Sequence, residues 1–425
     1  MGAAEEVMKS GGIPFVSDFG EIEEKTLKVL NDKKIAYESG GHSERALDAD
    51  LMILSPGVKA DSEIVQKARS GGVTVWPEIE LAYRICRGKI IGVTGSNGKT
   101  TTTTLTGEIL KNSGISTFVC GNIGNPFIGV AGEILPDGYA VVELSSFQLE
   151  TIEAFKPHIS MILNITPDHL DRHGSLENYA GAKLRIFKNQ DKEDFSIINF
   201  DDEYLKNRCN NLKSGTTWFS VQSSEAQIYA DPKGSLYVNG SELMQTKEIK
   251  LRGVHNLYNV CAAVAAATAI GIDKKTIIDT LKTFAGVEHR LEFVRLIGGV
   301  SFINDSKGTN VDSVYWALRA VSAPVILIAG GRDKAGDFSR LNDLVENKVK
   351  KVILIGEAAP KIRAVWDRLT DCVEAPGMKE AVGLAYQSAE VGDTVLLSPA
   401  CASFDMYNNY EERGRDFKDV VRGLK

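Results

Sequence analysis

The stretch GVTGSNGKTTTTTLTGEIL, residues 92–110, places Gly95, Gly98 and Lys99 before five consecutive threonines. Threonine is a mediocre helix former, so a helix that begins with five of them indicates a purpose other than helix propensity. A strand, a glycine loop and a helix start that carries lysine together form a phosphate cradle. Loop and helix N–H groups point at phosphate oxygens, the lysine reaches the β- and γ-phosphates, and the next hydroxyl ligates magnesium. The candidate nucleotide-binding residues are Gly95, Ser96, Asn97, Gly98, Lys99, Thr100 and Thr101.

The spacing of this loop departs from the common form GxxxxGK[ST]. Val93 stands where that form has its first glycine, which leaves GxxGKT. A tight turn capped by threonines is the structural alternative. The strand-like run before the loop and the helix-like run after it favour the phosphate loop.

Composition limits the class of protein. At 425 residues the chain is too long for a single core and suits two or three domains. A net charge of −7 gives no reason to expect nucleic acid or an anionic membrane as a partner. No apolar run reaches transmembrane length, and the first ten residues lack the apolar core of a signal peptide. Six widely spaced cysteines without a CxxC pair predict reduced thiols in a cytoplasmic enzyme.

Short apolar runs alternate with amphipathic stretches along most of the chain. This alternation predicts right-handed βαβ units and hence an α/β protein with parallel, doubly wound sheets. The runs expected as buried strands are KIIGVTG, STFVCG, YAVVELSS, HISMILNI, PVILIAGG, KVILIG and DTVLLSPA. A segment punctuated by Gly, Asp and Ser between TTWFSV and IKLRGV predicts a small antiparallel sheet.

Three groups of such units predict three domains. We place them at residues 1–88, 89–286 and 287–425. The first is Rossmann-like but opens in a helical pattern, whereas a nucleotide-binding half of this kind normally begins with a strand and a glycine turn. We therefore expect a first domain that lacks its first strand. The second is a P-loop ATPase-like domain, and the third is again Rossmann-like.

Three further stretches could complete a magnesium site behind the phosphate loop. Glu143 ends a predicted strand, at the edge where open α/β sheets bind ligands. Asp168 and His169 follow the next strand, and Lys183 lies on a predicted helix after them. Taken singly, a capping Asp168, a surface His169 and a solvated Lys183 are the simpler interpretations. Their common position after a phosphate loop favours a shared site.

These motifs, together with others in the same order, resemble the Mur ligase family, and within it the members that add D-glutamate. The resemblance extends over residues 92–414. The matching motifs are GVTGSNGKTTT, GNIGNP, ELSSFQLE, ITPDHLDRH, YAGAKLRIF, GVHNLYN, GVEHRLE, FINDSKGTN and LLSPACASFDMYNNYEERG. In the first domain only the ligand loops VSDFG and LSPGV have counterparts, so binding of the uridine diphosphate group is the least supported part of the resemblance.

The resemblance implies an ATP-dependent amide ligase of peptidoglycan precursor synthesis. ATP would phosphorylate the carboxylate of UDP-N-acetylmuramoyl-L-alanine, and the amine of D-glutamate would attack the acyl phosphate. It implies that Lys99 neutralises the phosphoryl group and that Thr100 and Glu143 hold one Mg²⁺. It also implies that His169 and a carbamate on Lys183 hold a second ion, with Mn²⁺ as an alternative metal. The family also implies a monomer.

The same matching assigns the remaining site residues. For ATP it implies Asn256 and Asn259 at adenine, Arg290 at phosphate and Asp305 at the ribose. We expect Asp305 to end the first strand of the third domain. Asn256 and Asn259 have a simpler interpretation as caps of an Ala-rich helix. For the UDP-linked substrate it implies Asp18, Ser55, Pro56, Gly57, Asn122, Ser145 and Ser146. For D-glutamate it implies Lys307, Thr309, Lys334, Ser403, Phe404 and Tyr410. A solvated Lys334 and a helix-capping Ser403 are the simpler alternatives.

Two rival functions remain open at this stage. The same scaffold serves ligases that add L-alanine, a diamino acid or a dipeptide, and it serves folylpolyglutamate synthases. A diamino-acid ligase would be expected to show a DNPR-like loop, and the sequence has none. A nucleotide-dependent switch would need neither a second-metal histidine nor a carbamate lysine.

Overall fold

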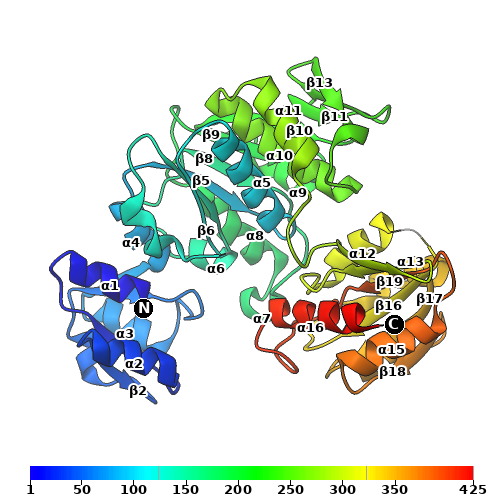
Figure 1. Cartoon of the computed structure of the whole chain (residues 1–425). Coiled ribbons are helices and arrows are strands. Elements are labelled where there is room, and N and C mark those ends of the chain that lie inside the picture. Colours follow the sequence, from blue (N-terminus) through cyan, green and yellow to red (C-terminus); the bar gives the residue numbers. More distant parts are fainter. Residues whose placement is uncertain (123, 322, 425) are drawn as a thin grey trace.

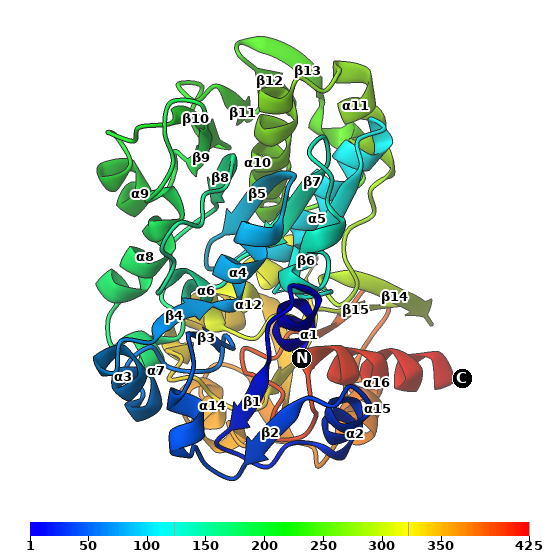
Figure 2. The same cartoon turned by 90° about the vertical axis from the view of Figure 1, so that its left-hand side faces the viewer.

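The computed structural model describes residues 1–122, 124–321 and 323–424. Three α/β bodies follow one another along the chain, with the N-terminal body beside the central one and the C-terminal body on its other side (Figure 1). Figure 2 shows the central body, with its large sheet, above the other two bodies. Across the described residues, no helix combines the length and the apolar character needed to cross a lipid bilayer.

The N-terminal body is built from short elements around a small core. Its strands pair in parallel as two separate sheets, β1 with β2 and β3 with β4. Its elements are α1 (Gly2–Lys9), β1 (Phe15–Asp18), α2 (Glu24–Asp32), β2 (Ala36–Ser39), β3 (Leu51–Leu54), α3 (Glu63–Ser70), β4 (Thr74–Pro77) and α4 (Glu78–Ile85). Ala3 of α1 and Ile79 of α4 pack into the hydrophobic core of the central body, so these helices join the first body to the second.

A nine-stranded sheet forms the centre of the molecule, in the order β13-β12-β11-β10-β9-β8-β5-β7-β6. Its strands are β5 (Lys89–Thr94), β6 (Thr117–Gly121), β7 (Tyr139–Glu143), β8 (Ile159–Ile162), β9 (Phe195–Asn199), β10 (Gly215–Ser220), β11 (Ile228–Ala230), β12 (Ser235–Val238) and β13 (Ser241–Gln245). The expected antiparallel strands are present as β11–β13. They extend the edge of the parallel sheet through the parallel pair β10–β11.

Helices cover both faces of this sheet because each central strand is apolar on both sides. Ile91 and Val93 of β5 face the core formed with α5 and α10, which pack side by side, whereas Ile90 faces the opposite core. The helices are α5 (Lys99–Asn112), α6 (Ser146–Leu149), α7 (Leu170–His173), α8 (Leu176–Leu184), α9 (Glu203–Arg208), α10 (Val254–Ile270) and α11 (Lys274–Thr283). The Ala-rich α10 is buried along most of its length, as its composition predicts.

The chain reverses its direction of winding beside β5. This strand pairs with β7 on one side and β8 on the other. The loop after β5 therefore lies at the switch point of the sheet, where open α/β sheets form their ligand crevice. Residues that follow β5, β7 and β8 are thereby brought to one edge.

The C-terminal body repeats this plan with six strands in the order β14-β15-β19-β16-β17-β18. Its strands are β14 (Glu292–Ile297), β15 (Val300–Asn304), β16 (Val325–Gly330), β17 (Val349–Ile355), β18 (Asp371–Glu374) and β19 (Thr394–Leu397). Its helices are α12 (Val311–Ala320), α13 (Asn342–Lys348), α14 (Ala359–Trp366), α15 (Met378–Ser388) and α16 (Tyr410–Gly423). The expectation that Asp305 ends the first strand of this domain is wrong, because β14 precedes β15 and pairs with it antiparallel through a turn at Gly298 and Gly299.

Candidate active site

A cavity of about 520 Å³ lies between the central and C-terminal bodies. The carboxyl ends of β5 and β7 contribute one wall, and loops after β15 and β16 contribute the other. Of the residues predicted for the site, its wall contains Ser96, Asn97, Gly98, Lys99, Thr100, Asn122, Glu143, His169, Arg290, Lys307, Thr309, Lys334 and Tyr410. The structure therefore brings the nucleotide, metal and amino-acid candidates together in a single space.

The phosphate loop is held in a shape that requires glycine. Gly98 caps α5 with a φ of 88°, in the left-handed region that favours glycine. A Cβ at this position would lie 2.2 Å from Asn259 Oδ1. Gly98 is thus needed for its backbone conformation and for the close approach of α10.

Lys99 begins α5, and its ammonium folds back over the loop. Its Nζ donates to the carbonyl oxygens of Gly95 at 2.9 Å and Ser96 at 2.8 Å. Burial lowers the pKa of Lys99, and the charge of Glu143 opposes that shift. A phosphate oxygen is a stronger partner for a buried ammonium than a neutral carbonyl, so the lysine is poised to bind an anion in the cavity.

Glu143, the last residue of β7, carries an unsatisfied buried oxygen. Its Oε1 accepts a hydrogen bond from Asn122 Nδ2 at 3.2 Å, whereas Oε2 has no partner among the described residues. A buried carboxylate oxygen without a donor is costly unless a cation binds it. With the hydroxyl of Thr100 on the same wall, Glu143 offers the hard oxygen ligands that Mg²⁺ prefers, so these residues fit the metal.

The loop after β8 brings a second acid and a histidine to the cavity. His169 has a φ of 52°, a strained conformation for a side chain other than glycine, and its N–H donates to Asp168 Oδ1 at 3.0 Å. Burial alone would raise the pKa of Asp168, but Lys334 and His169 lower it overall. Asp168 is therefore an anion that connects the central body to Lys334 of the C-terminal body, with Lys334 Nζ at 3.8 Å.

Lys183 lies on α8 behind the phosphate loop and is 2% exposed. Its Nζ donates to Thr94 Oγ1 at 3.4 Å and lies 4.6 Å from the centre of the Tyr179 ring. Burial, followed by the charge of Lys99, holds the pKa of Lys183 well below its ordinary value. The side chain is buried rather than solvated, so the simpler interpretation is wrong for this residue.

Cationic and hydroxyl groups form the C-terminal wall of the cavity. Lys307 Nζ donates to Tyr410 Oη at 3.0 Å, and burial lowers the pKa of Lys307 to about 8. Thr309 follows on the same loop, and Lys334 comes from the loop after β16. These groups match the requirements of an acidic amino acid, which needs positive charge and donors for two carboxylates.

Five of the predicted ATP residues lie away from the cavity wall: Gly95, Thr101, Asn256, Asn259 and Asp305. Asp305 is buried, accepts from Ser398 Oγ at 2.7 Å, and has its pKa raised to about 6 by burial. Asn259 accepts from Thr102 Oγ1 at 3.2 Å and donates to Asn256 Oδ1 at 3.0 Å. Thr101 is also buried. Contacts of these residues with adenine or ribose stay a prediction.

Ser403 and Phe404 also lie outside the cavity wall. The Ser403 side chain is buried, and its carbonyl accepts from the N–H groups of Met406 and Tyr407. Phe404 is 63% exposed. Their role at D-glutamate therefore stays a prediction.

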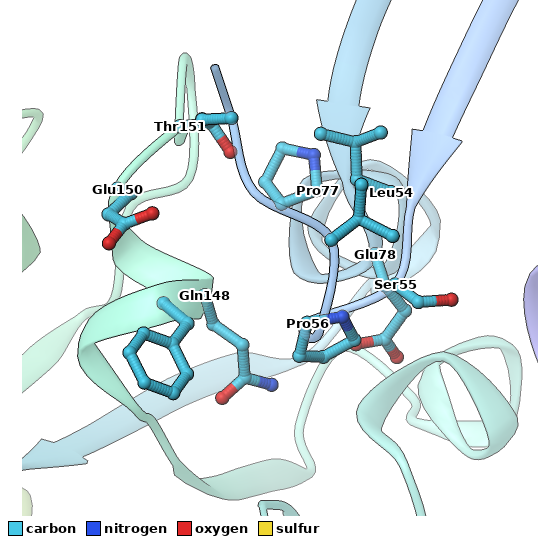
Figure 3. Close-up of a pocket in the computed structure, with 11 residues that line it drawn as sticks. Leu54, Ser55, Pro56, Pro77, Glu78, Gln148, Glu150 and Thr151 are labelled. Atoms are coloured by element: carbon cyan, nitrogen blue, oxygen red, sulfur yellow. The ribbon is translucent and has the colours of Figure 1, made fainter. Parts of the chain in front are cut away.

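The first-body candidates for the UDP-linked substrate lie at the end of β1 and on the loop that follows β3. Ser55 and Pro56 follow β3 and line a small cavity against Phe147, Gln148 and Glu150 (Figure 3). Asp18 is exposed at the end of β1 and accepts from the N–H of Gly20 at 2.9 Å. The carbonyl of Gly57 accepts from Arg172 Nη1 at 3.3 Å, which connects this loop to the segment that carries His169.

Ser145 and Ser146 both form hydrogen bonds within the central body. Ser145 caps α6 in a reciprocal capping box with Gln148. Ser146 Oγ lies 2.9 Å from His173 Nε2 in a buried contact. Both serines remain next to Glu143 and the small cavity, and substrate contacts by them stay a prediction.

Comparisons with known proteins agree with this geometry. Residues 7–64 match the MurD N-terminal domain, residues 93–267 the Mur ligase middle domain, and residues 289–401 the Mur ligase glutamate ligase domain. A UDP-N-acetylmuramoylalanine–D-glutamate ligase of Thermoanaerobacter sp. is 45% identical, and the alignment covers 95% of this chain and 91% of that protein. The same-named enzyme of Koribacter versatilis is 47% identical over 94% of this chain and 89% of its own length.

The chain belongs to the Mur ligase family. Among solved structures, UDP-N-acetylmuramate-alanine ligase MurC from Thermotoga maritima aligns over 100% of this chain and 96% of its own, with a TM-score of 0.65 and 22% identity. A pseudomurein peptide ligase type C from Methanothermus fervidus aligns over 100% and 97%, with a TM-score of 0.66 and 20% identity. At these identities the structural likeness establishes the shared three-domain fold.

The sequence reasoning missed several residues of this Mur ligase site. Arg172 stacks over Phe147 at 4.1 Å and bridges to the first body, although only its place in the ITPDHLDRH motif pointed to it. Asp312 and Ser313 reach the phosphate loop from α12. A contact between residues 215 positions apart leaves no local signal in the sequence.

Proposed function

We propose that this Mur ligase joins D-glutamate to UDP-N-acetylmuramoyl-L-alanine at the expense of ATP, as a step of peptidoglycan precursor synthesis. Support comes from relatives that bear the name UDP-N-acetylmuramoylalanine–D-glutamate ligase, at 44–47% identity over almost the whole chain. The match of residues 7–64 to the MurD N-terminal domain agrees with these names, and the match of residues 289–401 to the Mur ligase, glutamate ligase domain is consistent with them.

One structural observation carries the proposal. The phosphate loop with Lys99 and the lysines of the C-terminal body line the same cavity. A nucleotide switch needs the first group alone, whereas a ligase must hold a phosphoryl donor and an acidic amine acceptor within reaction distance. Lys307 and Lys334 therefore favour ligation over a switch.

The residues support a two-step reaction. The substrate carboxylate attacks the γ-phosphorus of ATP, which forms the acyl phosphate and releases ADP. The amine of D-glutamate then attacks the acyl carbon, the C–O bond to phosphate breaks, and a proton leaves the nitrogen. Lys99 neutralises charge on the phosphoryl group during transfer, and the loop N–H groups fix its orientation.

Thr100 and Glu143 would hold Mg²⁺, and His169 with Lys183 would hold a second ion, for which Mn²⁺ is an alternative. Bound metal supplies charge neutralisation across the phosphate oxygens. Glu143 Oε2 is the ligand atom that the structure leaves without a donor in the described part of the chain.

Lys183 meets the chemical requirement for carbamate formation. In its unprotonated form the amine can attack carbon dioxide, which forms an N–C bond, releases one proton to water and leaves a carbamate anion. Only the unprotonated amine can react in this way, and the lowered pKa of Lys183 favours that form. The product converts a cation that repels metals into an oxygen ligand.

The remaining assignments complete the proposal. Lys334, with Lys307, Thr309, Tyr410, Ser403 and Phe404, would bind D-glutamate, and the loops at Asp18 and at residues 55–57 would bind the UDP-linked substrate. We place the domain boundaries near residues 88 and 286, and we propose a cytoplasmic monomer.

A phosphate-release assay tests the function. ATP, Mg²⁺ and UDP-N-acetylmuramoyl-L-alanine are supplied with D-glutamate, L-glutamate, L-alanine or a diamino acid in turn. We expect amide formation with D-glutamate alone, because inversion of the α-carbon misplaces the attacking nitrogen. An equal rate with L-alanine or a diamino acid would reassign the chain to another Mur ligase activity, and Lys99→Ala should abolish turnover in either case.

A further inference from the structure

Both the nitrogen and the oxygen of the Asn97 side-chain amide form hydrogen bonds with the C-terminal body. Its Nδ2 donates to Asp312 Oδ2 at 2.6 Å, and its Oδ1 accepts from Ser313 Oγ at 2.8 Å. Asp312 and Ser313 lie in the first turn of α12, so both bonds cross the boundary between the two bodies.

The backbone of Asn97 is fixed independently of this contact. Its N–H donates to Asn164 Oδ1 at 2.8 Å, and its carbonyl accepts from Asn164 Nδ2 at 3.0 Å. Asn164 follows β8 in the central body. The loop therefore keeps its main-chain shape without α12, and the side-chain amide is free to serve as a binding point for the other body.

Asp312 is 7% exposed, and its surroundings come from both bodies. Thr166 Oγ1 of the central body donates to its Oδ2 at 3.4 Å, while Arg340 of its own body lies 3.8 Å from Oδ1. A carboxylate is buried at low cost only when donors surround it. Two of its donors exist only while the bodies are in contact, so Asp312 favours the closed arrangement.

A neighbouring contact lies in the same turn. Asn310 caps α12 through the N–H of Ser313 at 2.8 Å, and its Nδ2 also donates to Asp168 Oδ2 at 3.2 Å. The first turn of α12 thus contacts the phosphate loop and the Asp168 loop together.

We propose that Asp312 and Ser313 form a latch on Asn97 that holds the amino-acid-binding body against the phosphate loop. This inference rests on the proposed function, since it assigns the C-terminal body to D-glutamate. Asp312 is a positioning residue, because it contacts the loop and lies outside the cavity wall. Ser313 contacts the loop and also lines the cavity, together with Lys307 and Lys334.

The latch predicts that its loss lowers the affinity for D-glutamate more than the affinity for nucleotide. Loss of a hydrogen bond to a charged group shifts the closed-to-open ratio by roughly tenfold to hundredfold. D-glutamate needs both walls of the cavity, so its apparent affinity falls with the closed fraction. The loop that binds the phosphates keeps its backbone through Asn164, so the affinity for nucleotide should fall less than the affinity for D-glutamate.

The test compares Asp312→Ala, Asp312→Asn and the control Asp371→Ala. The control removes the exposed ion pair of Asp371 with Lys351, 2.8 Å apart within the same body. KM for D-glutamate, Kd for a non-hydrolysable ATP analogue, and the radius of gyration by small-angle X-ray scattering are measured for each. We expect Asp312→Ala to raise KM for D-glutamate roughly tenfold to hundredfold and to expand the enzyme. Asp312→Asn should fall between, because it keeps an acceptor oxygen but no charge.

A wild-type KM and an unchanged radius of gyration in Asp312→Ala would overturn the latch. If Asp312→Ala does not fold, the isosteric double variant Asp312→Asn/Ser313→Ala replaces it, with an expected increase in KM of about tenfold. Absence of D-glutamate ligation in the wild type would instead refute the proposed function, and the scattering comparison would still decide whether the latch closes the enzyme.

Discussion

The close approach of Asn259 to Gly98 leads to a prediction with an internal control. Gly98 and Gly114 flank the two ends of α5 at almost the same backbone angle, with φ of 88° and 85°. An added Cβ at Gly114 meets nothing within 4 Å, whereas at Gly98 it would lie 2.2 Å from Asn259 Oδ1. Substitution by alanine thus imposes the same backbone strain at both positions and a steric clash at only one.

The expected difference follows from the bonds that Asn259 would lose. The left-handed conformation costs alanine about 1–2 kcal/mol at either site. Displacement of Asn259 also breaks its contacts with Thr102 Oγ1 at 3.2 Å and Asn256 Oδ1 at 3.0 Å. At about 0.5–1.5 kcal/mol for each buried hydrogen bond, Gly98→Ala should be less stable than Gly114→Ala by ~1–3 kcal/mol.

Urea unfolding and ADP titration measure the two consequences. We expect Gly114→Ala to bind ADP like the wild type and Gly98→Ala to bind it roughly tenfold or more weakly, because the loop must move away from α10. The Asn259→Ala background lacks the obstructing amide, so Gly98→Ala should cost less stability in that background than in the wild type. Equal stability and equal ADP affinity for Gly98→Ala and Gly114→Ala would refute the reasoning.

Three further predictions concern other groups of the site. Lys183→Ala should lose nearly all ligase activity and regain part of it in added acetate, whose carboxylate can occupy the carbamate position; high activity without acetate would contradict the carbamate. Lys334→Ala should raise KM for D-glutamate roughly tenfold to hundredfold and leave KM for ATP unchanged, whereas Lys361→Ala, which removes an ion pair with Asp333 in the same region, should change neither. Burial raises the pKa of Asp305 from 3.8 to about 6, so the stability linked to its protonated form is present below pH 3.8 and lost as the pH rises through 6. Between pH 4 and pH 7 the free energy of unfolding of the wild type should fall by up to ~3 kcal/mol more than that of Asp305→Asn, as measured by urea unfolding. Parallel pH profiles of the two proteins would count against the raised pKa.

The sequence by itself determined the elements and the chemistry that each one carries. The apolar runs at residues 89–94, 139–143 and 159–162 became parallel strands because residues buried on both faces leave no polar alternation. Gly98 and Lys99 identified a phosphate loop because its backbone geometry and charge requirements are local. Such features are encoded within a few neighbouring residues and can be read without the fold.

The sequence also predicted which loops would meet, as far as topology allows. Glu143 and His169 line one cavity with Lys99, as expected for residues at the carboxyl ends of neighbouring strands. The same rule did not distinguish cavity-lining side chains from buried ones. Asp305 follows β15 and Ser403 lies in the segment after β19, but both side chains are buried and lie outside the cavity wall.

Only the tertiary structure decided the contacts between bodies and the electrostatic state of the site. Nothing near Asp312 in the sequence indicates Asn97, because their contact depends on how two separately folded bodies pack. The lowered pKa of Lys183 likewise depends on its burial beside Tyr179 and on the nearby charge of Lys99. Desolvation and inter-domain hydrogen bonds depend on neighbours that are distant in the sequence, so no local pattern of amino acids specifies them.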